Sequence, residues 1–293
     1  MLDYKGLEAL YTVQELQSFE EAAKKLHITQ SAISQRIKNL EILYGQPLLN
    51  RTLPYRATSL GQQLIGHFTR ICLLESELEK QLSAVNKPSI AIALNRDSLE
   101  TWFMDVIKKT DIFNQIALKV IADDQEKTLE YLKTGQVSAC LSTSEKEIMG
   151  GKVQFLGDME YVLAGSPEFV NQHFMKANPK ECLAKAVALK FDHHDTLHER
   201  YMEKFFGLNG KELNYHILPS VLGFKQFVLL GYGYGLIPKI DIVNELKKKQ
   251  LVKVYDKTWK IPLYWHYWEV ESSLYRKFNE EMIQHAKHRL DHV

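Results

Sequence analysis

The sequence predicts an α/β protein with an all-α N-terminal part, because two kinds of sequence follow one another along its 293 residues. Up to about residue 85 the apolar residues recur at the three- and four-residue spacing of helices. Beyond residue 88, short β-rich runs such as SIAIALN (89–95) and IALKVIA (116–122) alternate with helical segments, which predicts βα units and mostly parallel sheet. The length is enough for two or three domains with proper cores, and a hydrophobic content of 45% is that of an ordinary soluble globular protein.

The N-terminal part is predicted to contain a helix-turn-helix. Three helices are expected at about 4–17, 20–26 and 29–43. Ser18 with Glu21 forms the pattern of a capping box before the second helix, and Thr29 is placed to cap the third. Two short helices joined by a tight turn are typical of this motif.

The third predicted helix carries two stripes of residues on different faces. One stripe is apolar and is expected in the core: Ile33, Ile37 and Leu40. The other holds hydroxyl, amide and ammonium groups, whose reach suits base edges and phosphates: Ser31, Ser34, Gln35 and Lys38. The alternative for this second stripe is a merely solvated helix face.

Charge gathers beside this helix although the whole chain has a formal net charge of only +1. Between Lys24 and Arg56 there are six Lys/Arg against one acid, a local net charge of 6 − 1 = +5. Arg51 and Arg56 fall on two short predicted strands folded about Leu53-Pro54-Tyr55, and such a wing suits contact with phosphate or the minor groove. The alternative is that both are solvated surface arginines.

One long helix is expected from Thr58 to Val85. Its apolar residues follow a four-three spacing that favours a coiled coil with a second copy of the same helix: Leu64, Phe68, Ile71, Leu78, Leu82 and Val85. Asn86-Lys87-Pro88 is predicted to end the helix and to act as a linker.

The segment SFEEAAKKLHITQSAISQRIKNLEILYGQPLLNRT (18–52) resembles the DNA-binding domain of LysR-type transcriptional regulators. The resemblance implies a winged helix-turn-helix in residues 1–60, a linker helix and hinge in 61–88, and a two-subdomain, periplasmic-binding-protein-like effector domain in 89–293. We expect subdomain 1 in 89–161 and 267–293, and subdomain 2 in 162–266. The predicted contacts with double-stranded DNA are Thr29, Gln30, Ser31, Ser34, Gln35, Lys38, Arg51 and Arg56.

A narrower resemblance is to the lysine/arginine-responsive branch of that family, the ArgP/LysG (IciA-like) regulators. Six stretches carry it: QSAISQRIKNLE (30–41), GQPLLNRT (45–52), NRDSLETW (95–102), FDHHDTLH (191–198), GYGYGLIP (231–238) and LYWH (263–266). It implies a regulator of amino-acid export or metabolism that responds to lysine or arginine. The expected assembly is a homodimer that forms a homotetramer on DNA, with RNA polymerase as a further partner.

A basic amino acid carries one carboxylate and two cations, so its pocket needs an anion site and at least one acid. Asp97-Ser98-Leu99-Glu100 has the pattern of a capping box, and the same helix start, with nearby hydroxyl groups, suits a carboxylate. Acids at the ends of two predicted strands suit the cations or, alternatively, only cap helices. The candidate effector-binding residues are Ser98, Thr101, Asp123, Asp124, Ser142, Asp192, Asp195 and Ser220.

Other classes of protein are disfavoured by the sequence. The three cysteines, Cys72, Cys140 and Cys182, lie far apart in the sequence, form no CxxC or zinc pattern and are expected to be buried. The histidines His193, His194 and His198 are not part of an HExxH motif. No metal or cofactor is therefore predicted. The sequence contains no G-x-S-x-G motif and no P-loop, so nothing in it indicates an enzyme. It also contains no export signal and no apolar run of about 20 residues, so we expect a cytoplasmic protein without a membrane span. The alternatives are an α/β solute-binding protein or enzyme, and a sequence-tolerant architectural DNA binder.

Overall fold

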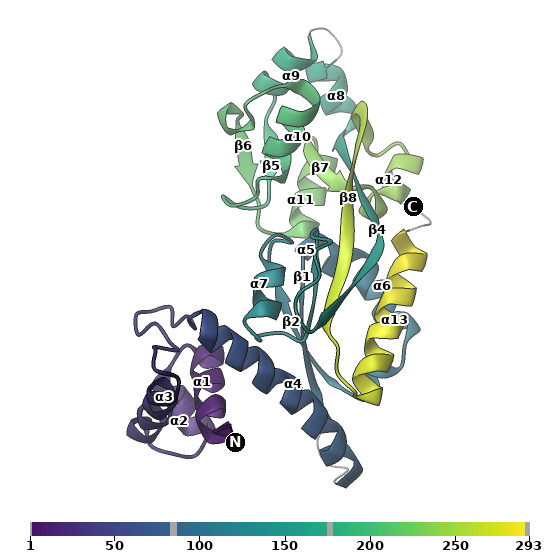
Figure 1. Ribbon diagram of the computed structural model, residues 1–293. Coiled ribbons are helices and arrows are strands. Elements are labelled where there is room, and N and C mark those ends of the chain that lie inside the picture. Colours follow the sequence, from purple (N-terminus) through teal and green to yellow (C-terminus); the bar gives the residue numbers. More distant parts are fainter. Residues whose placement is uncertain (1, 83–86, 175–177, 291–293) are drawn as a thin grey trace. The chain divides into compact units, whose positions relative to one another are not determined.

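The structure is a computed structural model that describes residues 2–82, 87–174 and 178–290 (Figure 1). It divides into two compact units. Unit 1 consists of Met1–Asn95, Thr110–Gln154 and Tyr264–Ile283, and unit 2 of Arg96–Lys109, Phe155–Leu263 and Gln284–Val293. The predicted boundaries of the DNA-binding, linker and effector parts stay predictions.

Unit 1 begins with the three predicted helices, α1 (Tyr4–Leu16), α2 (Phe19–Lys25) and α3 (Gln30–Tyr44). Both predicted caps are present: the Ser18 hydroxyl accepts a hydrogen bond from the Glu21 amide at 3.2 Å, and the Thr29 hydroxyl accepts one from the Ala32 amide at 3.2 Å. Such caps satisfy amides that have no partner within the helix. The helix-turn-helix is therefore fixed by local sequence.

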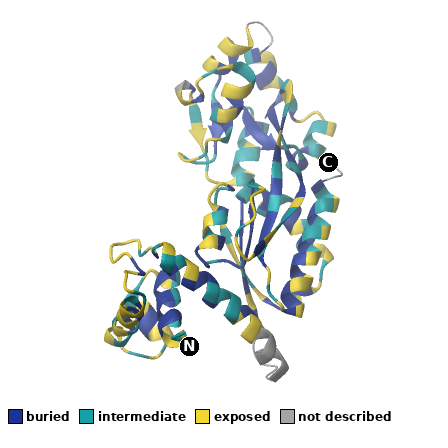
Figure 2. Ribbon diagram, viewed as in Figure 1, coloured by how far each residue is buried: buried dark blue, intermediate teal, exposed yellow. Residues whose placement is uncertain are grey.

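The core beneath these helices includes the first half of the long helix α4 (Ser59–Leu82) (Figure 2). Ile33 and Ile37 are fully buried, as the apolar stripe predicts. Leu64 and Phe68 are also only 8% exposed and belong to the same core, because α4 packs against α1. The prediction that these two residues form a seam with a second copy is wrong. The side chains of Leu78 and Leu82, and all of Val85, lie outside the described residues.

The wing differs from the two strands that were predicted. Between α3 and α4 the structure has a single isolated bridge, which pairs Leu49 with Ala57. Backbone hydrogen bonds join Asn50 to Arg56 at 2.8 Å and Thr58 to Leu48 at 2.9 Å. The segment is therefore a short hairpin closed by these bonds, and residues 51–55 form the loop between them.

The α/β part of unit 1 has a small sheet. Parallel pairs join β1 (Ser89–Leu94) to β2 (Ala117–Ala122) and to β3 (Ala139–Ser142), and β3 is antiparallel to β8 (Val252–Trp268). Trp265 and Leu263 in β8 are fully buried and belong to the core. The remaining elements that begin in this unit are η2 (Ile112–Asn114), α7 (Thr128–Lys133) and α13 (Ser273–Leu290).

Unit 2 contains an antiparallel pair, β4 (Gly151–Gly165) with β7 (Gly235–Pro238), and a parallel pair, β5 (Ala188–Lys190) with β6 (Tyr215–Ile217). The helices are α5 (Arg96–Ser98), η1 (Leu99–Phe103), α6 (Met104–Lys109), α8 (Pro167–Phe174), α9 (Pro179–Lys185), α10 (Leu197–Phe206), η3 (Gly210–Glu212), α11 (Val221–Leu229), η4 (Lys239–Asp241) and α12 (Val243–Lys247). The long strands β4 and β8 belong to both units.

Parallel and antiparallel pairs occur together among β1, β2, β3, β4, β7 and β8, and of the described strands only β5 with β6 forms a purely parallel sheet, so the prediction of mostly parallel sheet is wrong. The antiparallel pairs come from β4, β7 and β8, and β4 and β8 are 15 and 17 residues long. The runs at 89–95 and 116–122, from which parallel sheet was expected, do form a parallel pair, β1 with β2, but β4 and β8 add antiparallel pairs. Long strands that return along their neighbours give antiparallel pairing without a crossover helix.

Burial and packing bear on the cysteines and on the GYGYGLIP segment. Cys140 and Cys182 are buried, whereas Cys72 is exposed on α4, contrary to the prediction. The glycines of GYGYGLIP allow close packing, since a Cβ at Gly235 would lie 2.4 Å from a ring carbon of Phe224. Among the described residues, no helix has the length and hydropathy required for a membrane span.

Candidate DNA-binding surface and effector-binding residues

The polar stripe of α3 lies at the surface of unit 1. Thr29, Gln30, Ser31, Gln35 and Lys38 are exposed and Ser34 is half-buried. Because the apolar stripe of α3 is buried, this face is directed away from the core (Figure 2). The predicted hydroxyl, amide and ammonium groups are therefore accessible to a partner.

Two hydrogen bonds order these side chains. The hydroxyls of Thr29 and Ser31 lie 2.9 Å apart, and the Gln35 amide donates to the Asn39 side-chain oxygen at 2.8 Å. Asn39 is exposed and was not predicted as a site residue, although its spacing of four residues from Gln35 places both on one face. It extends the hydrogen-bonding face of α3 by one turn.

Glu41 connects α3 to the wing. One carboxylate oxygen accepts from the Leu48 amide at 3.0 Å and the other pairs with the Arg51 guanidinium at 3.0 Å. The Arg51 side chain is still 54% exposed, and Arg56 is exposed as well. Both arginines are thus available on the same hairpin, and Leu53 at its tip is 71% exposed.

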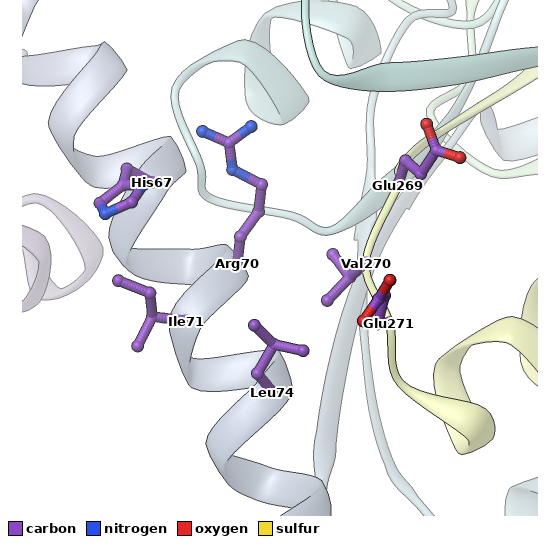
Figure 3. A pocket seen from close by; sticks show the side chains of 7 residues that line it. All are labelled: His67, Arg70, Ile71, Leu74, Glu269, Val270 and Glu271. Atoms are coloured by element: carbon purple, nitrogen blue, oxygen red, sulfur yellow. The ribbon is translucent and has the colours of Figure 1, made fainter.

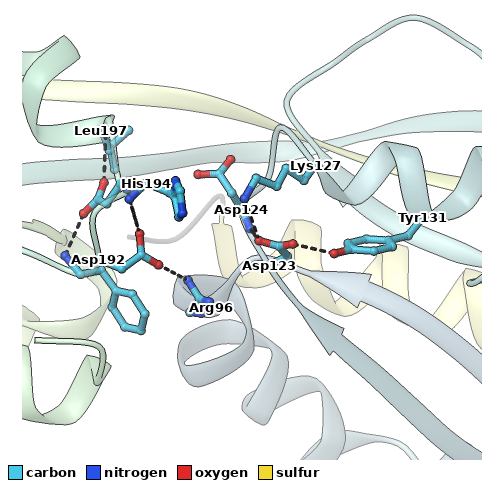
Figure 4. Close-up of polar contacts among 10 residues, drawn as sticks. Arg96, Asp123, Asp124, Lys127, Tyr131, Asp192, His194 and Leu197 are labelled. Atoms are coloured by element: carbon cyan, nitrogen blue, oxygen red, sulfur yellow. Dashed lines mark hydrogen bonds and ion pairs between the residues drawn. The ribbon is translucent and has the colours of Figure 1, made fainter. Parts of the chain in front are cut away.

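In unit 1, the acids predicted at the end of β2 make local contacts (Figure 4). The Tyr131 hydroxyl donates to Asp123 at 2.6 Å, and Lys127 lies 3.6 Å from the same carboxylate. Asp124 accepts from the Glu126 amide at 2.8 Å. Burial and the Asp123 carboxylate raise the pKa of Tyr131 to about 12, so its hydroxyl stays a donor. Ser142 is buried and accepts from the Ser144 amide.

In unit 2, the predicted capping box at Asp97 is absent, because the helix begins one residue earlier, at Arg96. The Asp97 carboxylate instead accepts a 2.6 Å hydrogen bond from the Tyr161 hydroxyl. Ser98 is fully buried, and the Thr101 hydroxyl donates to the Asp97 carbonyl at 2.5 Å. The two hydroxyl groups therefore do not face an open helix start.

Burial raises the pKa of Asp97 to about 6, although the Tyr161 hydrogen bond opposes that shift. The neighbouring carboxylates of Asp195 and Asp241 raise the pKa further, and Arg96 lowers it. A carboxyl with a pKa near neutrality changes charge within the physiological range.

The acids after β5 are held by backbone amides (Figure 4). One oxygen of Asp192 accepts from the amides of His194 and Asp195 at 2.8 and 2.9 Å, and the other pairs with Arg96 at 3.2 Å. Partial burial opposes it, but these amides and Arg96 hold the pKa of Asp192 below its ordinary value. Both carboxylate oxygens of Asp195 accept backbone amides, from Phe191 and Leu197, at 3.0 Å.

Ser220 lies at the start of α11. The Ser220 hydroxyl caps α11 by accepting a hydrogen bond from the Gly223 amide at 3.0 Å, and Ser220 is exposed. No group of three or more His, Cys, Asp or Glu in the described parts of the chain is arranged to hold a metal ion.

A pocket that the sequence did not indicate lies in unit 1, against the exposed side of α4 (Figure 3). Its lining combines apolar side chains with one arginine and two glutamates. Leu74 in this lining is 43% exposed, and the Arg70 guanidinium lies 5.0 Å from the centroid of the Trp268 ring. The lining consists of His67, Arg70, Ile71, Leu74, Glu269, Val270 and Glu271.

Comparison with known proteins agrees with this arrangement. Residues 4–62 match the family described as "Bacterial regulatory helix-turn-helix protein, lysR family". The "HTH-type transcriptional regulator ArgP" of Vibrio cholerae serotype O1 is 36% identical over 290 residues, covering 98% of this chain and 97% of the relative. The regulator of the same name from Aeromonas salmonicida is 38% identical over 294 residues, covering 99% and 98%.

Solved structures give the same result for the fold. ArgP from Mycobacterium tuberculosis has a TM-score of 0.85 at 33% identity, covering 98% of both chains. Full-length LysG from Corynebacterium glutamicum with bound effector Arg has a TM-score of 0.79 at 28% identity, covering 97% of this chain and 98% of that one. The predicted fold class, α/β with an all-α helix-turn-helix part at the N-terminus, is confirmed, and the effector domain is of the mixed α/β kind.

A helix-turn-helix with an exposed hydrogen-bonding face and a basic wing, joined to such an α/β part, defines a DNA-binding transcriptional regulator. The chain belongs to the LysR family of these regulators, and within it to the ArgP/LysG branch.

Proposed function

We propose that this protein recognises promoter DNA through α3 and the wing, and that a basic amino acid, lysine or arginine, controls the promoter activity. The observation that supports the first part is the exposed hydroxyl and amide face of α3 beside Arg51 and Arg56. Side chains of this length reach base edges when a helix lies in the major groove. The wing arginines add sequence-independent phosphate contact.

The proposed DNA contacts are tested on two variants, Ser34→Ala and Gln35→Ala. Loss of a base contact should weaken binding to the operator by about 1–3 kcal/mol and leave binding to random DNA nearly unchanged. Fluorescence anisotropy with both DNAs measures this difference. Gln172→Ala, an exposed glutamine on α8, is the matched control and should change neither affinity. If both α3 variants still distinguish the operator from random DNA as well as the unmodified protein does, α3 is not the recognition helix.

For the effector, the proposal is supported by the arginine bound to LysG from Corynebacterium glutamicum and by the ArgP names of the relatives. The acids after β2 and β5 supply carboxylates of the kind that pair with ammonium or guanidinium groups. We keep Asp123, Asp124, Asp192 and Asp195 as candidates, with Ser98, Thr101, Ser142 and Ser220.

A thermal-shift screen of the twenty amino acids tests the effector class. A ligand at about 100 times its Kd adds roughly 2.7 kcal/mol to the stability of the folded protein. Lysine or arginine should give the largest shift, and Asp192→Asn should reduce it without loss of folding or DNA binding. If no basic amino acid produces a shift in the unmodified protein, the proposed effector class is wrong.

We further propose that the regulator acts as a homodimer that assembles to a homotetramer, that it contacts RNA polymerase at the promoter, and that it catalyses no reaction. The exposed apolar side of α4 at Ile71 and Leu74 supports self-association (Figure 3). An architectural DNA binder would instead show a steep salt dependence without a defined footprint.

A further inference from the structure

Asp192 already holds a guanidinium, and that guanidinium belongs to the chain itself. The Arg96 side chain lies 3.2 Å from Oδ2 of Asp192, the carboxylate oxygen that accepts no hydrogen bond from the His194 or Asp195 amide (Figure 4). Its central carbon also lies 4.5 Å from the centroid of the Phe191 ring. Arg96, Phe191 and Asp192 all belong to unit 2, so this contact lies within one compact body.

These two partners are the ones that a free arginine side chain would need. A carboxylate and an aromatic face together recognise the charge and the plane of a guanidinium. The second oxygen of Asp192 is fixed by the amides of His194 and Asp195, so the carboxylate is oriented whether or not Arg96 is present. Arg96 therefore occupies a subsite that is built by other groups.

We propose that Arg96 is an intramolecular competitor of the effector: it fills the cation subsite of Asp192 and Phe191, and an effector arginine displaces it. This inference rests on the proposed function, because it names the ligand of that same site. It also decides between the two basic amino acids. A guanidinium replaces both the ion pair and the planar stacking that Arg96 makes, whereas the lysine ammonium can pair with Asp192 and lie over the Phe191 ring but has no plane to stack on it.

The strength of the competition follows from exposure. The side chains of Arg96 and Asp192 are 39% and 31% exposed, so their ion pair is partly screened by water. A pair of this kind together with a half-exposed cation–π contact should weaken effector binding by roughly 3- to 30-fold. The internal arginine is thus displaceable, and it raises the concentration of effector needed for a response.

The test uses Arg96→Gln in the full-length protein, with arginine and lysine titrated separately by calorimetry. Removing the competitor should tighten arginine binding by roughly 3- to 30-fold. Arg96→Lys keeps the positive charge but not the planar group, so it should tighten binding less. Arg200→Gln is the matched control, because the Arg200 guanidinium lies 5.4 Å from the Trp259 ring in the same unit. It should leave the affinity unchanged.

A second variant tests the aromatic half of the subsite. Phe191→Leu should weaken the binding of arginine more than that of lysine, since only the guanidinium stacks on the ring. An equal loss for both ligands would overturn the assignment of arginine as the preferred effector.

The outcomes separate the two proposals. If the unmodified protein binds arginine and Arg96→Gln binds it equally well or more weakly, Arg96 is no competitor and this inference fails while the proposed function stands. Weaker binding would mean that Arg96 itself holds the ligand. If neither protein binds any basic amino acid, the proposed effector class fails and the inference fails with it.

Discussion

The hydroxyl of Thr69 on α4 donates a 2.8 Å hydrogen bond to the carbonyl of Gly135, the second residue after α7. A second bond of this kind joins the Gln14 amide of α1 to the Thr134 carbonyl at 3.4 Å. The helix-turn-helix part and the α/β part of unit 1 therefore contact each other through the turn that follows α7. Within α7 itself, the hydroxyl of Tyr131 donates a hydrogen bond to Asp123, one of the candidate effector residues.

Gly135 is predicted to be required at this contact. Its φ is +72°, and a Cβ would lie 2.7 Å from a methyl carbon of Ile65 and 2.9 Å from the amide nitrogen of Gly66. Gly135→Ala should lower the free energy of unfolding by about 2–4 kcal/mol, from the left-handed backbone and the clash together. Chemical denaturation measures the change.

Gly45→Ala is the matched control for Gly135→Ala. Gly45 has a φ of +69° at the end of α3, but nothing lies within 4 Å of its added Cβ. This variant should lose only about 1–2 kcal/mol from backbone strain. Equal losses for the two variants would show that the contact between α4 and the turn after α7 is not tight in solution.

The carboxyl of Asp97 gives a prediction for pH. Burial raises the pKa of Asp97 from 3.8 to about 6, so between these pH values the folded chain holds the proton more tightly than the unfolded chain. The contribution of Asp97 to stability is therefore full at low pH and is lost as the pH rises through about 6. From about pH 4 to about pH 7 the stability of the unmodified protein relative to Asp97→Asn should fall by on the order of 2 kcal/mol.

Asp97→Asn keeps the side-chain size and an oxygen that accepts from Tyr161, but it does not titrate. Comparing both proteins at each pH cancels the other titrating groups, including His198, whose pKa burial lowers to about 3. Parallel stability curves for the two proteins across this range would contradict a raised pKa at Asp97.

The N-terminal part was predictable because its signals are local. Ser18 and Thr29 cap helices within three residues of themselves, and the stripe of Ile33 and Ile37 needs only the helical period. The family resemblance rests on the same segment, and the matching relatives confirm it. The polar stripe of α3 is exposed because the apolar stripe on the other side of the same helix is buried in the core.

The features that the sequence did not predict depend on contacts between residues far apart in the chain. The spacing of apolar residues carries no information on such contacts. Leu64 and Phe68 have coiled-coil spacing, yet α1 covers them within the chain. Asp97 has the sequence of a cap, yet its partner is Tyr161, 64 residues away. The pairing of Arg96 with Asp192 spans 96 residues and has no local signal at all. The eight effector candidates therefore stay predictions.

The wing arginines should strengthen DNA binding through their charge and should not distinguish one DNA sequence from another. Arg51→Ala should weaken binding to operator and random DNA alike and lower the slope of log K against log salt by about 1. Its pairing with Glu41 leaves the Arg51 side chain 54% exposed, so the guanidinium remains available to a phosphate. Lys185→Ala removes a cation that is 79% exposed on α9 and should leave the slope unchanged. A loss confined to the operator would assign Arg51 to base recognition instead.

The last prediction concerns self-association through α4. Leu74 is 43% exposed and borders the pocket with Ile71 and Val270 (Figure 3). If a second copy covers this apolar surface, Leu74→Glu places an unpaired charge in the interface and should shift the assembly toward monomer. Met149→Glu, at a residue that is 92% exposed, adds the same charge elsewhere and should leave the assembly intact. Light scattering after size-exclusion chromatography measures the mass of each, and an unchanged mass for Leu74→Glu would place the dimer contact away from this part of α4.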